Sequence, residues 1–483
     1  MSADYIGYYA IDNAGQLIWF EKLVNGTLSD GTAKNENANA VLTNNITLNN
    51  ETFVFEPDTG LIKVTGEAVA YLGTGIKGNG SGANEAFDTT ASTMGPWYTL
   101  AADGYETTYA YSGTIRVWTP IDNYSGIFDG NGKTVSGLYI NGTADRVGLF
   151  GMVTGTVKNL GVINSYIRGS SYVGAVGGKN NGSFEGCYNA GFVGGDLVFI
   201  GGVVGLNSGT VKGCYNAGYI SGNNYVGGVA GKSEGNSISG CYNIGTVIGY
   251  GYYTYVGGVC GCIYFADLTD CYNIGTVSGY DDGATVGGVC GDGDGTYGKI
   301  SNCYNIGTVS GVGEGVSIGG ICGTIDSCEI SNCYYLADSE TDSIDGTTFK
   351  TSAQFASGEV AWLLQDAQTD KTVQTWGQVK LGEATPILTS DARYAVRRVE
   401  CGDTPYYNTN KLYGDINNDM KVDYDDLTRL LKASVGIGYS DGGIDSDAAG
   451  LALADLNSDG TIDAIDAAML EMAISGGSDY KLQ

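Results

Sequence analysis

Two sequence markers recur at one shared spacing through the middle of this chain, and this repetition constrains the fold more than any other feature. The first marker is a Cys-Tyr pair that begins at Cys187, Cys214, Cys241, Cys271, Cys303 and Cys333. The second is an apolar residue followed by glycine, and it begins at Val147, Val173, Ile200, Val226, Val256, Val286 and Ile318. Successive copies of each marker lie 26 to 32 residues apart. Two independent markers with one period indicate a solenoid of stacked repeats.

Each repeat consists of short apolar segments separated by Gly, Asn, Ser or Asp, as in residues 225–249. Segments this short are typical of strands and not of helices. A repeat of about 30 residues with about three short strands corresponds to one coil of a β-solenoid. We therefore expect a mainly β fold, a right-handed parallel β-helix, in which equivalent residues of neighbouring coils form ladders with a spacing of about 4.8 Å.

Stacking of the coils predicts two inward columns of cysteine. The Cys-Tyr cysteines form one column, and Cys260, Cys290 and Cys322 form the other. Stacked residues have parallel Cα–Cβ bonds, which is a poor geometry for a disulfide, so we expect free thiols that fill the core and not a disulfide or metal framework. The cysteines outside these columns, whose redox state stays open, are Cys262, Cys328 and Cys401.

The residues after these cysteines predict two further ladders. Side-chain amides are expected to bond coil to coil at Asn189, Asn216, Asn243, Asn273 and Asn305. The tyrosines alternate outward, and the stripe consists of Tyr188, Tyr215, Tyr242, Tyr272 and Tyr304. Two interpretations of this stripe stay open: it stacks on a ligand such as a sugar, or it packs on itself and shields the strands.

The repeats resemble the GLUG family. Its Gly-Leu-apolar-Gly signature occurs literally at Gly148-Leu149-Phe150-Gly151, and residues 128–140 look like the opening coil of such proteins. The resemblance covers about residues 125–335. It implies a solenoid of the kind found in bacterial surface and adhesion-like proteins, some of which flank immunoglobulin A metalloproteases.

Composition excludes several classes of function. The chain contains no histidine, which excludes Ser-His-Asp and Cys-His nucleophiles and zinc protease motifs that depend on histidine. A formal net charge of -29 with only 24 Lys and Arg residues argues against binding to nucleic acid or to anionic membranes.

The chain has no run of 18 or more apolar residues, so no transmembrane helix is predicted. The start, Met1-Ser2-Ala3-Asp4, lacks the features of a signal peptide, so we expect that it is absent from this chain.

Amphipathic segments at both ends of the repeats predict helical caps. Residues 11–26 form the first helix, with Asp12 or Asn13 as N-cap, and residues 351–367 form the second. The expected domains are an N-terminal cap with the first coils (1–120), the GLUG-type repeats (121–345), a C-terminal cap helix with strands (346–395), a linker (396–410) and a small all-α calcium-binding tail (411–483). The fold of residues 50–110 is left open.

Two twelve-residue loops, residues 415–426 and 455–466, carry oxygen-bearing side chains at positions 1, 3, 5, 9 and 12. Such ligands, with the backbone carbonyl of position 7, suit a hard cation such as Ca²⁺. The predicted ligands of the first loop are Asp415, Asn417, Asp419, Lys421 (by its carbonyl), Asp423 and Asp426. Those of the second loop are Asp455, Asn457, Asp459, Thr461 (by its carbonyl), Asp463 and Asp466. Such a small acidic unit is expected to fold only with its metal.

Position 12 is Asp and not Glu, and neither loop has a clear entering helix, so residues 411–478 resemble a type I-like dockerin. The resemblance implies two bound Ca²⁺ ions, a cohesin module of a scaffoldin as partner, a cellulosome-like complex and an extracellular or cell-surface location. It also implies that loop positions 10 and 11 and the helix after them contact the cohesin. In this chain these residues are Tyr424, Asp425, Leu431, Lys432, Ala464 and Ile465. The two copies differ, which argues against symmetric docking.

Two functions stay open for the solenoid. The favoured one is a secreted, non-catalytic adhesive or carbohydrate-binding module that the dockerin brings to a scaffoldin. The alternative is a polysaccharide lyase or glycoside hydrolase of the β-helix type, in polysaccharide degradation. A hydrolase needs two carboxylates across a cleft, and the sequence does not pair candidates such as Asp129 and Glu185. The ligand and the particular cohesin are not identified.

Overall fold

The chain folds into two compact units, residues 1–335 with 342–347, and residues 336–341 with 348–483. The structure is a computed structural model. It describes residues 5–50, 52–56, 61–65, 97–100, 106–109, 115–295, 297–337, 346–378, 385–391, 394–399, 406–408, 424–434, 454, 456 and 462–475.

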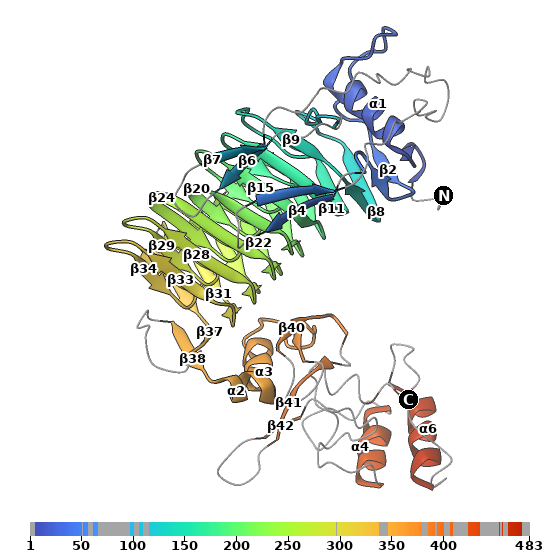
Figure 1. Ribbon diagram of the computed structural model, residues 1–483. Helices are drawn as coiled ribbons and strands as arrows, with labels where there is room; N and C mark the ends of the chain where they lie inside the picture. The colour runs from blue at the N-terminus through green and yellow to red at the C-terminus, as the bar shows by residue number, and fades with distance from the viewer. Residues whose placement is uncertain are drawn as a thin grey trace. The chain divides into compact units, whose positions relative to one another are not determined.

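The first unit is a β-solenoid, which confirms the predicted fold class (Figure 1). One parallel sheet has seven strands, β10 (Phe150–Val153), β13 (Gly177–Asn180), β17 (Val204–Asn207), β21 (Ala230–Glu234), β25 (Cys260–Tyr264), β30 (Cys290–Asp294) and β35 (Cys322–Asp326). The remaining strands of the coils are β9 (Tyr139–Asn141), β11 (Thr156–Gly169), β12 (Val173–Gly174), β14 (Ser183–Glu185), β15 (Tyr188–Gly195), β16 (Ile200–Gly201), β18 (Thr210–Lys212), β19 (Tyr215–Asn216), β20 (Tyr219–Gly227), β22 (Ser237–Ser239), β23 (Tyr242–Asn243), β24 (Thr246–Gly257), β26 (Asp267–Thr269), β27 (Tyr272–Asn273), β28 (Thr276–Tyr280), β29 (Thr285–Gly287), β31 (Lys299–Ser301), β32 (Tyr304–Asn305), β33 (Val309–Val312), β34 (Ser317–Gly319), β36 (Glu329–Ser331) and β37 (Cys333–Leu336).

Equivalent residues of successive coils pair in parallel register, as the repeat spacing predicts. Tyr215 pairs with Tyr188 before it and Tyr242 after it. The amide ladder is confirmed: Asn216 Nδ2 donates to Asn243 Oδ1 at 2.8 Å, and Asn243 Nδ2 donates to the next amide at 2.7 Å. These asparagines are buried, so the ladder satisfies polar groups that the core would otherwise leave unpaired.

Helix α1 (Ala14–Asn25) lies at the N-terminal end of the solenoid (Figure 1). Asn13 is its N-cap, one of the two candidates, because its side chain accepts the N–H of Gln16. The buried Phe20 ring lies 6.0 Å from the ring of Phe128, between centroids, in the opening coil. The predicted N-terminal cap is therefore present.

The stack begins with β1 (Tyr9–Ile11), which pairs in parallel with β2 (Ala40–Leu42). Strands β2 and β3 (Ile46–Thr47) in turn pair in parallel with β8 (Ile127–Ser136) of the next layer. Residues 50–110 contain two antiparallel pairs, β4 (Thr52–Glu56) with β5 (Leu61–Thr65) and β6 (Trp97–Leu100) with β7 (Glu106–Tyr109). Sequence patterning missed both pairs.

The second unit contains two short helices where a single helix was expected. Helices α2 (Ser352–Ser357) and α3 (Glu359–Asp366) are separated by Gly358, whose φ of 93° is left-handed and stops α2. The expectation of one helix over residues 351–367 is therefore wrong.

Short strands complete this part of the second unit. Strands β39 (Trp376–Gly377) and β40 (Ile387–Leu388) form an antiparallel pair within residues 346–395, where strands were expected. Residues 396–410, assigned to a linker, include a second antiparallel pair, β41 (Arg397–Val399) with β42 (Tyr406–Asn408). Strand β38 (Thr347–Lys350) precedes the helices, and the tail contributes α4 (Tyr424–Ser434) and α6 (Ala464–Ser475).

Candidate functional sites

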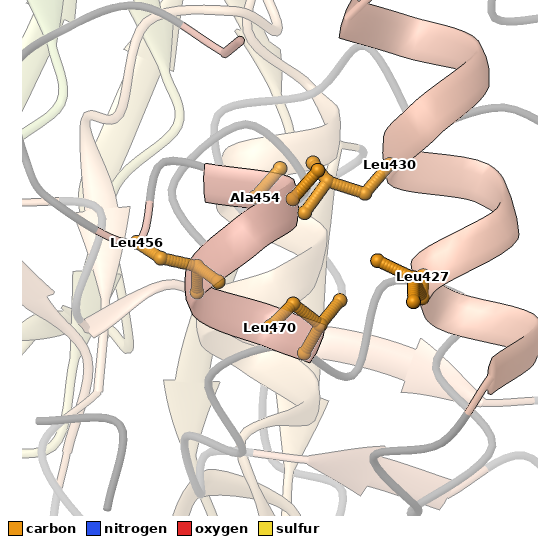
Figure 2. Close-up of a cluster of buried hydrophobic side chains, with 6 residues drawn as sticks. Leu427, Leu430, Ala454, Leu456 and Leu470 are labelled. Atoms are coloured by element: carbon orange, nitrogen blue, oxygen red, sulfur yellow. The ribbon is translucent and has the colours of Figure 1, made fainter. Parts of the chain in front are cut away.

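Helices α4 and α6 of the tail pack through a small apolar cluster (Figure 2). Leu427 and Leu430 of α4 lie against Leu456 and Leu470 from the second loop-helix copy. Leu430 and Leu470 are fully buried and occupy equivalent positions of the two copies, 40 residues apart. Both copies therefore present the same helix face to one shared core.

Position 12 of each predicted calcium loop is a fully buried aspartate, Asp426 and Asp466. One carboxylate oxygen of Asp466 accepts the backbone N–H of Leu456 at 2.7 Å, and the other accepts that of Asp463 at 2.9 Å. The Asp463 carboxylate accepts the N–H of Ile465 at 2.7 Å. In the second loop, residue 12 therefore reaches back to positions 2 and 9.

These contacts fit an oxygen-coordinated cation. Buried carboxylates in proteins are commonly paired or coordinate a metal ion, and oxygen ligands of this kind suit Ca²⁺. Within the described residues, no group of three or more Cys, Asp or Glu side chains could hold a metal ion. The predicted ligands that lie outside the described residues are Asp415, Asn417, Asp419, Lys421, Asp423, Asp455, Asn457, Asp459 and Thr461.

The residues predicted to contact a cohesin lie on the outer surface of the same helix pair. Tyr424 is 59% exposed, Leu431 48% and Ile465 56%. Asp425 and Ala464 are also exposed, whereas Lys432 is only partly exposed. Large apolar side chains exposed at these positions are unusual for a small acidic unit, and their contact with a partner stays a prediction.

The predicted tyrosine stripe is a stacked column. The rings of Tyr215 and Tyr242 lie 4.8 Å apart with 3° between their planes, and Tyr272 and Tyr304 lie 5.0 Å apart at 1°. Tyr304 is fully buried. Each ring face is covered by the neighbouring ring, which favours self-packing, one of the two interpretations left open. Binding of a ligand along this stripe stays a prediction.

A second aromatic column went unnoticed in the sequence. Its rings belong to Tyr172, Phe199, Tyr225 and Tyr255, each of which directly precedes a Val-Gly or Ile-Gly marker. This constant position before the marker is the sequence signal from which the column could have been predicted. Beside the column, Lys232 Nζ lies 4.8 Å from the Tyr264 ring centroid and 2.9 Å from Glu234 Oε1. The lysine is therefore held by a cation–π contact and an ion pair.

The cysteine columns are buried and free, as predicted. Every cysteine in the described part of the chain is a free thiol, and Cys328 is the most exposed of them. Burial raises the pKa of the Cys187 and Cys260 thiols well above the ordinary value. Cys401 lies outside the described residues.

Comparison with known proteins supports both parts of the chain. Residues 413–475 match the dockerin type I domain, and residues 252–278 match the GLUG motif. This chain is thus a β-solenoid protein that carries a GLUG motif and a type I dockerin domain. A dockerin is by class a cohesin-binding and calcium-binding module.

Two individual proteins are similar to parts of the chain. Halomucin of Haloquadratum walsbyi is 34% identical over 145 residues, which is 26% of this chain and 2% of halomucin. This chain therefore spans a small fraction of that relative. A solved structure of a proposed immunoglobulin A1 protease from Bacteroides ovatus has 20% identity and a TM-score of 0.37, and the match covers 57% of this chain and 81% of that one.

No helix in the described ranges is both long enough and apolar enough to cross a membrane.

Proposed function

We propose that this protein is a secreted, non-catalytic adhesive or carbohydrate-binding β-solenoid, and that its dockerin recruits it to a cohesin-bearing scaffoldin in a calcium-dependent manner. The observation that carries the proposal is the contrast between buried and exposed apolar side chains on α4 and α6. Leu430 and Leu470 are fully buried, whereas Tyr424, Leu431 and Ile465 are exposed. Large exposed apolar side chains are costly in water, and burial against a partner protein would remove that cost.

Calcium has a structural part in this proposal. Asp426 and Asp466, with Asp463, would hold the two ions together with the remaining predicted loop residues. A bound ion neutralises the carboxylates and fixes the loops from which α4 and α6 begin. The exposed face would therefore exist as one surface only in the calcium-bound state.

The environment of Asp129 supports a non-catalytic solenoid. This carboxylate is 2% exposed and accepts hydrogen bonds from the Tyr5 hydroxyl at 2.9 Å and the Asn159 amide at 3.1 Å. Lys158 lies 3.5 Å away and pairs in register with both Asp129 and Glu185, so it stands between the two carboxylates. Asp129 is thus engaged in holding the opening coil, and the two acids do not face each other across an open cleft.

A pull-down on an immobilised type I cohesin module tests the docking. The full chain is expected to bind with Ca²⁺ and to be released by a chelator, because the loops lose the charge that holds them. Leu431→Asp is expected to weaken binding at least tenfold, whereas the matched variant Ile244→Asp, at an exposed solenoid position, retains it. Binding that survives the chelator would refute the calcium dependence, and full binding by Leu431→Asp would refute the assigned face.

A further inference from the structure

Three successive coils of the solenoid carry an insertion at the same corner. This corner comprises residues 220–226 in one coil and, in register with it, residues 247–256 in the next, so it gains three residues. Residues 277–286 and 309–318 in the following two coils keep the longer form. We call the inserted segments the corner loops, and they are residues 250–254, 280–284 and 312–316, the last two lying between β28 and β29 and between β33 and β34 (Figure 1).

Hydrogen bonds join each corner loop to the next. The Gly251 N–H donates to Asp281 Oδ2 at 2.8 Å, and the Tyr253 N–H donates to the Asp282 carbonyl at 3.2 Å. The Glu314 N–H in turn donates to Asp282 Oδ1 at 2.8 Å. The three loops therefore form one connected surface.

This surface exposes large apolar side chains. Tyr252 is 73% exposed, Tyr253 71% and Val312 63%. A Cβ atom at Gly283 would lie 2.9 Å from the Tyr253 ring, so the glycine leaves room for this ring to lie against the backbone of the next loop. Tyr253 is thus held in place by its backbone and its ring while most of its side chain faces solvent, which is typical of an interaction surface.

The charge of the corner loops selects the kind of partner. Asp281, Asp282 and Glu314 are exposed beside the two tyrosines. In the sequence, residues 241–336 contain nine Asp and Glu and a single basic residue, Lys299, which lies on β31 and not in a corner loop. Residues 139–240 contain four acidic and six basic residues, so the excess of negative charge belongs to the coils that carry the insertions. A cationic partner complements this surface.

The combination of rings and carboxylates favours basic side chains of a protein over other occupants. Within the described residues, no group of three or more Cys, Asp or Glu side chains could hold a metal ion, so the corner loops are not a metal site. A neutral sugar would stack on the rings but gain nothing from the negative charge. An Arg or Lys side chain can lie over a tyrosine ring and also pair with a neighbouring carboxylate.

We propose that the corner loops form a docking surface for a basic, Arg- and Lys-rich segment of a partner protein. Its cationic side chains stack on Tyr252 and Tyr253 and pair with Asp281, Asp282 and Glu314. The inference rests on the adhesive form of the proposed function and assigns it a surface and a class of partner. Docking of the tail to a cohesin does not depend on it.

Fluorescence anisotropy with a labelled ten-residue peptide of alternating Gly and Arg tests the surface on the full chain in Ca²⁺ and about 0.15 M salt. The wild type is expected to bind this peptide and to bind neither a Gly/Glu nor a Gly/Ser peptide. Tyr253→Ala leaves the charge unchanged and is expected to weaken binding about fivefold, the size of an exposed cation–π contact. Its matched control is Tyr297→Ala, which removes an 85% exposed tyrosine from the loop between β30 and β31 and should bind as the wild type does.

Asp282→Asn tests the carboxylate and keeps an acceptor for the Glu314 N–H, so it preserves the loop contact even where Tyr253→Ala fails to fold. It is expected to weaken peptide binding at least threefold, whereas Asp326→Asn, which removes the same charge from another exposed position, should not.

The outcomes separate this surface from the rest of the proposed function. No binding of the Gly/Arg peptide by the wild type overturns the inference, and so does equal binding by each variant and its control. Cellohexaose binding that Tyr253→Ala abolishes would overturn the class of partner. The cohesin pull-down on the same variants is expected to be unchanged, so failure of this surface leaves the docking of the tail standing. Loss of cohesin binding in Tyr253→Ala or Asp282→Asn would overturn the independence of the two surfaces.

Discussion

The solenoid and the dockerin tail are stabilised in opposite ways. In the solenoid, the asparagines and tyrosines of the two ladders are supported by the same residue one coil away, so each of these interactions repeats along the chain. Among its described residues, the tail has a core of six buried side chains and two buried carboxylates. We expect a core of this size to need a metal ion in order to fold. On this proposal, repetition stabilises one region and a bound ion stabilises the other.

Calcium removal is the strongest test of this contrast. A chelator is expected to expose the amides of α4 and α6 completely and to leave those of β17 to β30 protected, because only the tail depends on the ion. Hydrogen–deuterium exchange measured by peptide, with and without Ca²⁺, gives both readings from one sample. Loss of protection in the solenoid strands, or retained protection in both helices, would contradict the contrast.

The next largest effect is expected within the tail core. Leu470→Ala removes a fully buried side chain from the α4–α6 contact and should cost about 3 kcal/mol of tail stability. The expected readout is a calcium midpoint for tail folding shifted to higher concentration, with an unchanged thermal transition of the solenoid. The control is Ala468→Ser at an exposed position of α6, which should shift neither. A lowered solenoid transition in Leu470→Ala would show that the two regions are not independent.

A break in the asparagine ladder tests the solenoid side. Asn243→Leu removes the acceptor of the Asn216 amide, which stays buried, and of the Gly245 N–H, which is partly buried. The expected loss is about 2 kcal/mol, measured as a lower thermal midpoint of the solenoid, since each unsatisfied buried donor costs about 1 kcal/mol or more. The exposed neighbour Ile244 provides the control as Ile244→Ser. An unchanged midpoint would mean that the ladder is not a source of stability.

The sequence predicted the structural features that repeat from coil to coil and missed those that depend on a single contact. A shared period places residues in register, so the Asn216–Asn243 contact follows from spacing alone. The helix break at Gly358 does not follow from the sequence, because the apolar pattern continues on both sides of this residue. Only its left-handed backbone conformation shows that α2 ends there. In the same way, alternation places Tyr304 outward, but its complete burial depends on its neighbours in space. The ligand geometry of the calcium loops likewise depends on an ion that the sequence only implies.

Thiol reactivity gives the smallest expected effect and sharpens the contrast at the level of single side chains. Burial raises the pKa of Cys328 to about 12, so little thiolate exists near neutral pH, and the thiolate is the reactive form. Alkylation of Cys328 by iodoacetamide is therefore expected to be slow at pH 7 and to rise about tenfold per pH unit as long as the solenoid stays folded. The Cys214 and Cys290 columns, which are fully buried, should stay unlabelled over the same range. Peptide mass spectrometry with and without chelator measures the labelling. Equal labelling in both conditions would confirm that the solenoid packs its thiols without calcium. Labelling of the two cysteine columns only after chelation would show that the ion stabilises the repeats as well.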